Sequence, residues 1–211
     1  MIGFSALIAV GLALVISVKT GFYLLVILFF SITLSIIAPF FDTPALKKSG
    51  NLIYYSPLFL SEKPKKGVIK IHGGTLFDYV FVIDRRMSGK QRTNLIVQQY
   101  LEGLLNLIEE NENGKPENVR IRGTSYIINA RTAQRIGFRI VPTDYIQKVI
   151  LTYNYFNLLI SYSIAKGKLS FPKLRETKTF ETNLNELVRR KGVISSLNKK
   201  LKSAIAKSAK A

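Results

Sequence analysis

The residues best placed for chemistry in this chain are His72 and the two glycines that follow it. His72 is the only histidine, and the chain contains no cysteine. In the stretch IHGGT, the backbone N–H groups of Gly73 and Gly74 could stabilise an oxyanion. A serine hydrolase would also need a histidine base, and His72 cannot fill both positions. A turn in which two glycines let the backbone bend is the simpler interpretation, so the catalytic residues stay unassigned.

A second group of residues could bind a phosphate-bearing cofactor. Residues 76–84 are expected to form a strand, and a helix is expected from Thr93, so the loop between them could present backbone N–H groups to a pyrophosphate. The loop residues with suitable side chains or backbone are Arg86, Ser88, Gly89 and Lys90. The alternative is a basic loop that faces solvent or lipid.

A stretch farther along the chain adds to this hypothesis. The sequence NARTAQRIGFRIV, which begins at Asn129, resembles the Asn, Ala and Gly-Phe pattern near the end of the superfamily of acetyl-CoA-dependent N-acetyltransferases. The resemblance implies an acyltransferase whose acyl-CoA site includes Asn129 together with the loop at Arg86–Lys90.

The first 41 residues form a strongly apolar segment, in which the only charged side chain is Lys19. As one helix they would extend roughly 60 Å, about twice the hydrocarbon core of a bilayer. The polar break Val18–Gly21 divides them into two runs that are each near the length of a span. We therefore expect residues 1–41 to form a transmembrane helical hairpin. A cleaved signal peptide is the alternative, but no Lys or Arg precedes the first apolar run.

The remainder of the chain is strongly basic. Residues 42–211 hold 30 Lys and Arg residues and 13 Asp and Glu residues, a net charge of +17. Lys47 and Lys48 follow the hairpin directly, and cations close to a span favour the cytoplasmic side. This pattern predicts an inner or plasma membrane protein with its C-terminal domain in the cytoplasm. The sequence shows no cluster of ligands with metal-binding spacing, and we assign neither a metal nor a cofactor.

Residues 42–179 are expected to form a small mixed α+β domain. Strands are expected within 51–62, 67–74, 76–84 and 118–129, and a helix over 93–114, where apolar residues recur at helical spacing. The apolar segment Tyr145–Ala165 has three interpretations: a helix buried in the domain, a helix on the membrane surface with its tyrosines among the headgroups, or a third span.

Residues 180–211 are expected to form a basic amphipathic helix or tail. Leu187, Ile194 and Leu201 recur at seven-residue steps along an apolar stripe that could lie in the headgroup region of an anionic leaflet. A partner helix and plain solvent are alternative surroundings for this stripe, and nucleic acid is the least favoured. The residues expected to contact the lipid surface are Lys47, Lys48, Lys65, Lys66, Arg189, Arg190, Lys191, Lys199, Lys200 and Lys202.

Together these features predict an integral membrane protein whose cationic domain lies against an anionic leaflet. The expected role is that of a non-catalytic accessory or scaffold subunit of a membrane assembly, with a membrane protein as partner. The alternative is a membrane-anchored acyltransferase that acts on a lipid or a membrane-borne substrate.

Overall fold

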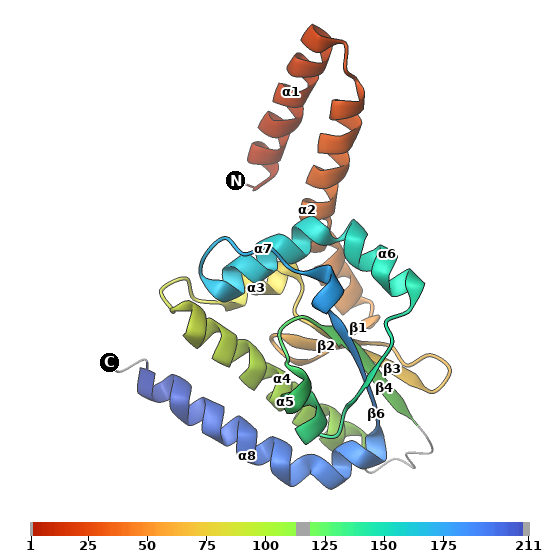
Figure 1. The fold of residues 1–211 in the computed structure, drawn as a ribbon, viewed down its shortest axis with the longest axis vertical. Coiled ribbons are helices and arrows are strands. Elements are labelled where there is room, and N and C mark those ends of the chain that lie inside the picture. The colour runs from red at the N-terminus through yellow and green to blue at the C-terminus, as the bar shows by residue number, and fades with distance from the viewer. Residues whose placement is uncertain (1, 113–118, 209–211) are drawn as a thin grey trace.

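The structure is a computed structural model that describes residues 2–112 and 119–208. Two helices, α1 (Ile2–Thr20) and α2 (Leu24–Lys48), form a hairpin that projects from one end of a mixed α+β domain (Figure 1). The chain turns between them at Gly21, whose positive φ of 70° suits glycine. Within the described residues, one helix is long and apolar enough to cross a membrane, Val26–Lys48, a property that signal sequences and buried core helices share.

A six-stranded mixed sheet forms the centre of the domain, with strand order β1-β2-β3-β4-β6-β5. β3 and β4 run parallel, with Ile69 opposite Ile121, and the other neighbouring strands run antiparallel. The strands are β1 (Leu52–Ser56), β2 (Phe59–Glu62), β3 (Val68–Gly73), β4 (Arg120–Ser125), β5 (Arg139–Val141) and β6 (Lys178–Asn183).

Six helices and one short 3-10 turn accompany the sheet. α4 contacts β1 and β2 on one side and α8 on another, while α3 and α7 lie at the end of the domain from which α2 emerges (Figure 1). The helices are α3 (Leu76–Val82), α4 (Gly89–Asn111), α5 (Ala130–Arg135), α6 (Tyr145–Tyr153), α7 (Tyr155–Lys166) and α8 (Leu184–Ser208), and the 3-10 turn is Leu174–Glu176.

The core of the domain forms where α4 packs between the sheet and α8. Ile96, Leu107 and Ile108 of α4 are fully buried, as is Ile121 of β4. Each such side chain contributes about 1.5–3 kcal/mol through removal of apolar surface from water. The helix begins at a capping box in which the side chain of Ser88 accepts from the Gln91 N–H. The predicted mixed α+β class is thus confirmed, as is a helix in this region, but α4 begins one turn earlier than Thr93, and the expected end at residues 113–114 lies outside the described residues.

The strand predicted at residues 76–84 is wrong, because this segment forms the helix α3. Thr75 and Asp78 form a capping box that starts the helix. Helical spacing then buries Leu76, Tyr79 and Ile83 in the domain, while Phe81 remains two-thirds exposed. The alternation of aromatic residues that resembles a strand therefore serves two different faces of a helix.

The C-terminal region begins differently from the prediction as well. β6, which the sequence analysis did not predict, crosses the expected boundary at residue 180 and pairs with both β4 and β5. Residues 209–211 of the expected tail lie outside the described residues. The segment Tyr145–Ala165 is divided at Asn154 into α6 and most of α7.

Candidate functional site

The junction between α2 and the domain brings together residues from three distant parts of the chain. Pro39 has no backbone N–H, so the carbonyl of Ser35, four residues earlier, loses its helical donor. The side chain of Asn157 on α7 fills that place, because its Nδ2 donates to the Ser35 carbonyl oxygen at 2.8 Å. The hairpin is therefore joined to the domain by a specific hydrogen bond.

Two further contacts hold the last part of α2 against α3. The ring of Phe40 packs edge-on against Phe77 and Phe81, at centroid distances of 6.0 and 6.3 Å. Nearby, the buried hydroxyl of Thr43 donates to Oγ1 of Thr75 at 3.2 Å. α2 thus continues from the apolar hairpin into the packed domain as one helix.

A buried carboxylate lies beside this junction. Oδ2 of Asp78 accepts from the backbone N–H of Thr75 at 2.7 Å, and both carboxylate oxygens accept from the Tyr54 hydroxyl at 3.1 Å. Burial raises the pKa of Asp78 above its ordinary value, and these hydrogen bonds oppose that shift. Lys47 lies over the Tyr54 ring at 4.8 Å from its centroid. The Asp78 carboxylate caps the N-terminus of α3, which is a structural role.

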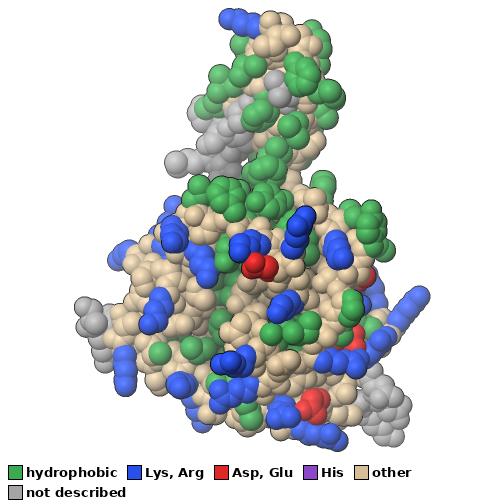
Figure 2. Space-filling view, viewed as in Figure 1, with side chains coloured by type: hydrophobic (Ala, Val, Ile, Leu, Met, Phe, Trp, Pro, Cys, Tyr) green, Lys and Arg blue, Asp and Glu red, His purple; other side chains and the backbone are tan. Residues whose placement is uncertain are grey.

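Large apolar side chains are exposed around the base of the hairpin (Figure 2). They come from α3, from α6 and from the loop after α7, and six of them are exposed by more than 60%. None of the residues of α6 is buried. We call the six most exposed of these residues the collar: Phe81, Tyr145, Ile146, Tyr153, Leu169 and Phe171.

A small apolar pocket lies at the carboxyl ends of the parallel strands β3 and β4. Its lining includes His72, Tyr100, Ser125 and Phe138. Nε2 of His72 lies 3.0 Å from Oε1 of Glu62, and this hydrogen bond lowers the pKa of that carboxyl group. Burial raises the pKa of Tyr100 to about 12, so its hydroxyl stays protonated at neutral pH.

The glycines after His72 have packing roles. A Cβ atom at Gly73 would overlap the Tyr100 hydroxyl, and one at Gly74 would press on Leu58 and Asp78. The stretch is the end of β3 and the entry to α3. The interpretation of this tripeptide as a close-packed turn agrees with these contacts.

The loop predicted to bind acyl-CoA follows a helix instead of a strand. Ser88 and Gln91 satisfy each other's backbone N–H groups at the start of α4, and a Cβ at Gly89 would overlap the Lys166 carbonyl at the end of α7. The start of α4 is therefore covered by the chain itself. The other predicted members lie elsewhere or point away: Arg86 and Lys90 are exposed, and Asn129 caps α5 by accepting from the Thr132 N–H at 2.8 Å.

The predicted lipid-surface residues fall into two distant groups. Lys47 and Lys48 end α2, and Lys65 and Lys66 lie in the turn between β2 and β3. The six predicted lipid-surface residues on α8 lie at the opposite end of the domain from the hairpin (Figure 1). The apolar stripe of α8 is covered by α4, since Leu187 and Ile194 are fully buried.

Four of the α8 cations pair with carboxylates of this chain. Nζ of Lys191 lies 2.9 Å from Glu112, and Arg189 and Arg190 pair with Glu186 of their own helix. Within the described residues, Lys199 and Lys200 form no ion pair.

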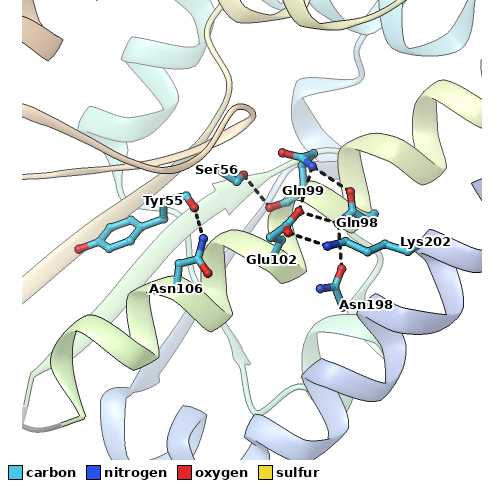
Figure 3. A network of polar contacts seen from close by, with 8 residues as sticks. All are labelled: Tyr55, Ser56, Gln98, Gln99, Glu102, Asn106, Asn198 and Lys202. Atoms are coloured by element: carbon cyan, nitrogen blue, oxygen red, sulfur yellow. Dashed lines mark hydrogen bonds and ion pairs between the residues drawn. The ribbon is translucent and has the colours of Figure 1, made fainter.

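A polar network joins the far end of α8 to α4 (Figure 3). Nζ of Lys202 lies 2.7 Å from Oε1 of Glu102, whose other oxygen accepts from Gln98 at 2.8 Å. Gln98 also donates to the buried Asn198 at 2.9 Å. The network continues along α4 to β1, where Ser56 donates to the Gln99 carbonyl and Asn106 donates to the Tyr55 carbonyl.

Sequence reasoning missed the Asn157–Ser35 bond and the collar residues of α3 and of the loop after α7, whereas a membrane-surface helix was one of the three interpretations of the segment that contains α6. Pro39 could have been used to predict the Asn157–Ser35 bond, because a proline within an apolar helix leaves the carbonyl four residues earlier without a backbone donor. No family model, curated protein or solved structure matches this chain.

Proposed function

We propose that this chain is an integral membrane protein whose N-terminal hairpin crosses the bilayer twice and holds a cationic domain against an anionic leaflet. The domain faces the cytoplasm beneath the inner or plasma membrane. Its role is that of a non-catalytic accessory or scaffold subunit of a membrane assembly.

The observation that carries this proposal is the continuity of α2 from the apolar hairpin into the domain. A flexible tether would let the domain rotate freely, whereas the Asn157–Ser35 and Thr43–Thr75 hydrogen bonds fix its orientation relative to the hairpin. A fixed orientation is what a subunit needs to present one surface to a neighbour in the membrane.

The arrangement of polar groups supports a non-catalytic role. The single histidine pairs with Glu62, and the buried carboxylate of Asp78 caps α3.

Two measurements on native membranes test the proposal. Carbonate and high-salt washes should leave the protein in the pellet, because apolar spans are insensitive to screening whereas charge-driven adsorption weakens as the Debye length falls to about 3 Å at 1 M salt. After mild detergent extraction, native mass spectrometry should show a fixed stoichiometry with one membrane protein. Release by salt alone would contradict the membrane-spanning part of the proposal, and a chain that is always alone would contradict the subunit role.

The pocket beside His72 favours one alternative, a membrane-anchored acyltransferase. In α/β sheets, ligands bind outside the carboxyl ends of parallel strands, and this pocket occupies that place between β3 and β4. It lies apart from the loop at Arg86–Lys90. Thermal stabilisation by acetyl-CoA or a long-chain acyl-CoA would favour this alternative. The absence of any shift would argue against it.

A further inference from the structure

We infer that the domain is partly immersed in the leaflet, with the collar in contact with lipid acyl chains and the basic residues next to the collar at headgroup level. This inference rests on the proposed membrane anchoring and adds a second surface to it. The lipid contact of the domain is then formed by α3, α6 and the loop after α7, and it does not involve α8.

The length of α2 carries the first step. Leu24–Phe41 contains no charged side chain and rises roughly 27 Å, close to the about 30 Å hydrocarbon core of a bilayer. The domain, however, already contacts α2 at Ser35, through the Asn157 hydrogen bond. If the whole domain stayed outside the hydrocarbon, only Leu24–Leu34 would remain to cross it, roughly 16 Å of helix.

The depth of α2 therefore sets the depth of its neighbours. Asn157 lies level with Ser35, and Phe77 and Phe81 lie level with Phe40, all within the uncharged part of α2. The aromatic face of α3 must then be near the inner boundary of the hydrocarbon. Phe41 is 72% exposed at this level, which is the exposure expected of a side chain that faces lipid.

Satisfied polar groups make this depth tolerable. The carbonyl that Pro39 leaves without a donor would be costly in hydrocarbon, and Asn157 supplies the donor from the domain. Ser31, one turn earlier, directs its hydroxyl to the Ile27 carbonyl at 2.8 Å. The exposed hydroxyl of Ser31 and the carbonyl of Ser35 thus both have hydrogen-bond partners, whereas Oδ1 of Asn157 is buried without one in the described structure.

The composition of α6 points to a membrane surface as its partner. Tyr145, Ile146 and Tyr153 are at least 70% exposed on a helix with no buried residue, and Lys148 is exposed beside them. Tyrosines at the ends of an apolar face, with a lysine that can extend to the headgroups, are typical of helices that lie in the interface.

Cations lie close to collar residues in the sequence, on either side of them. Arg85 and Arg86 come after α3, and Lys168 precedes Leu169. All three are exposed. Because they adjoin apolar side chains that would enter the leaflet, they are placed for lipid phosphate, as the polybasic segments next to membrane anchors are.

Exposed apolar side chains extend from the hairpin onto the adjoining end of the domain (Figure 2). Whatever surrounds Phe41 and the lower part of α2 also meets the collar, since α3 packs on that part of α2. Lipid is therefore the single occupant that fits both surfaces, and a second copy of the chain or a partner helix becomes an outcome of the test.

Tryptophan fluorescence tests the inference cleanly, because the chain has no tryptophan of its own. The full chain is reconstituted into neutral phosphatidylcholine vesicles with or without mid-chain brominated lipid. Tyr153→Trp and Phe171→Trp report the collar, Phe29→Trp reports the hairpin, and Lys200→Trp on α8 is the matched control. Emission of the two collar variants should fall about twofold or more with brominated lipid, since an interfacial helix is buried about 5–10 Å, and the control should not change.

The four tryptophan variants distinguish this inference from the membrane anchoring on which it rests. If Phe29→Trp is quenched and both collar variants behave like Lys200→Trp, the collar does not contact lipid and the inference is overturned while anchoring stands. If Phe29→Trp is not quenched, the anchoring fails and the inference fails with it. Collar emission that is blue-shifted without quenching would also overturn the inference, because it would show that protein covers the collar.

Discussion

α6 and α8 are both amphipathic helices, yet the structure treats their apolar faces in opposite ways. Leu187 and Ile194 of α8 are fully buried against the rest of the domain. Tyr145, Ile146 and Tyr153 of α6 are at least 70% exposed. An apolar stripe on a helix indicates that another apolar surface covers it, but the stripe does not identify whether that surface is protein or lipid.

The two helices also differ in where their charges go. The cations of α8 largely pair with carboxylates of this chain, such as Lys202 with Glu102 and Lys191 with Glu112. α6 carries a single cation, Lys148, which is exposed. The helix with more positive charge is thus the one held by its own protein, and the nearly neutral helix is the one left open at the base of the hairpin.

The largest expected effect separates the two apolar faces by stability. Leu187→Ala should lower the free energy of unfolding by about 2–5 kcal/mol, because it leaves a cavity between α8 and α4. Ile146→Ala on α6 should change it by less than about 0.5 kcal/mol in detergent. Chemical denaturation of the purified protein measures both. Equal losses would show that α6 is covered by the chain and would break the comparison.

Loss of the Asn157–Ser35 hydrogen bond, which joins α7 to the hairpin, should have a smaller effect on stability. Asn157→Ala should cost about 1–3 kcal/mol, because the Ser35 carbonyl is left without a donor. Pro39→Ala restores a backbone N–H at residue 39 that can reach this carbonyl. In the Pro39→Ala background, Asn157→Ala should therefore cost clearly less in a double-mutant cycle. Additive losses would mean that the carbonyl is not what Asn157 satisfies.

The charges of α8 should matter less still. Lys202→Ala removes an ion pair whose carboxylate also accepts from Gln98, and it should cost about 0.2–1 kcal/mol. Lys200→Ala, the control without an ion pair in the described structure, should change stability by less. Thermal unfolding at low and high salt measures the difference, which should shrink as salt rises. A larger loss of stability for Lys200→Ala than for Lys202→Ala would contradict this prediction, because it would show that the Lys202–Glu102 ion pair is not the stabilising interaction.

The smallest expected effect concerns His72, which lies away from both helices. His72 holds the pKa of Glu62 below its ordinary value, so this carboxylate stabilises the fold above its unfolded-state pKa, and that contribution disappears as pH falls through the lower folded-state pKa. His72→Ala should cost less than about 1 kcal/mol, because both side chains are a third or more exposed. The acid side of the stability curve should become shallower. An unchanged curve would show that the pair contributes nothing.

The parts of the fold that the sequence predicted have strong local signals. α4 was predicted from the helical spacing of Ile96, Tyr100, Leu104 and Leu107, whereas its capping box at Ser88 was not recognised and its start was therefore placed one turn too late, at Thr93. β3 likewise follows from its alternation of Ile69 and Ile71 with polar residues.

The sequence-based predictions fail where tertiary contacts determine the secondary structure. In α3, Phe77 and Phe81 pack on Phe40, so aromatic residues occupy a face that an isolated helix would not need, and their alternation resembles a strand. β5 and β6 are short strands whose pairing depends on each other and on β4. The stripe of α8 was predictable, but its cover was not, because lipid and a neighbouring helix select the same residue pattern.

The proposed orientation of the domain depends most directly on which helix faces the bilayer. Because the chain has no cysteine, a spin label can be attached at Val149→Cys on α6 and at Ser196→Cys on α8 in proteoliposomes, and its collisions with oxygen and with a water-soluble nickel chelate can be compared. Oxygen concentrates in lipid, so the label on α6 should favour oxygen and the label on α8 should favour nickel. Equal accessibility at the two positions, or the reverse order, would contradict the proposed orientation of the domain.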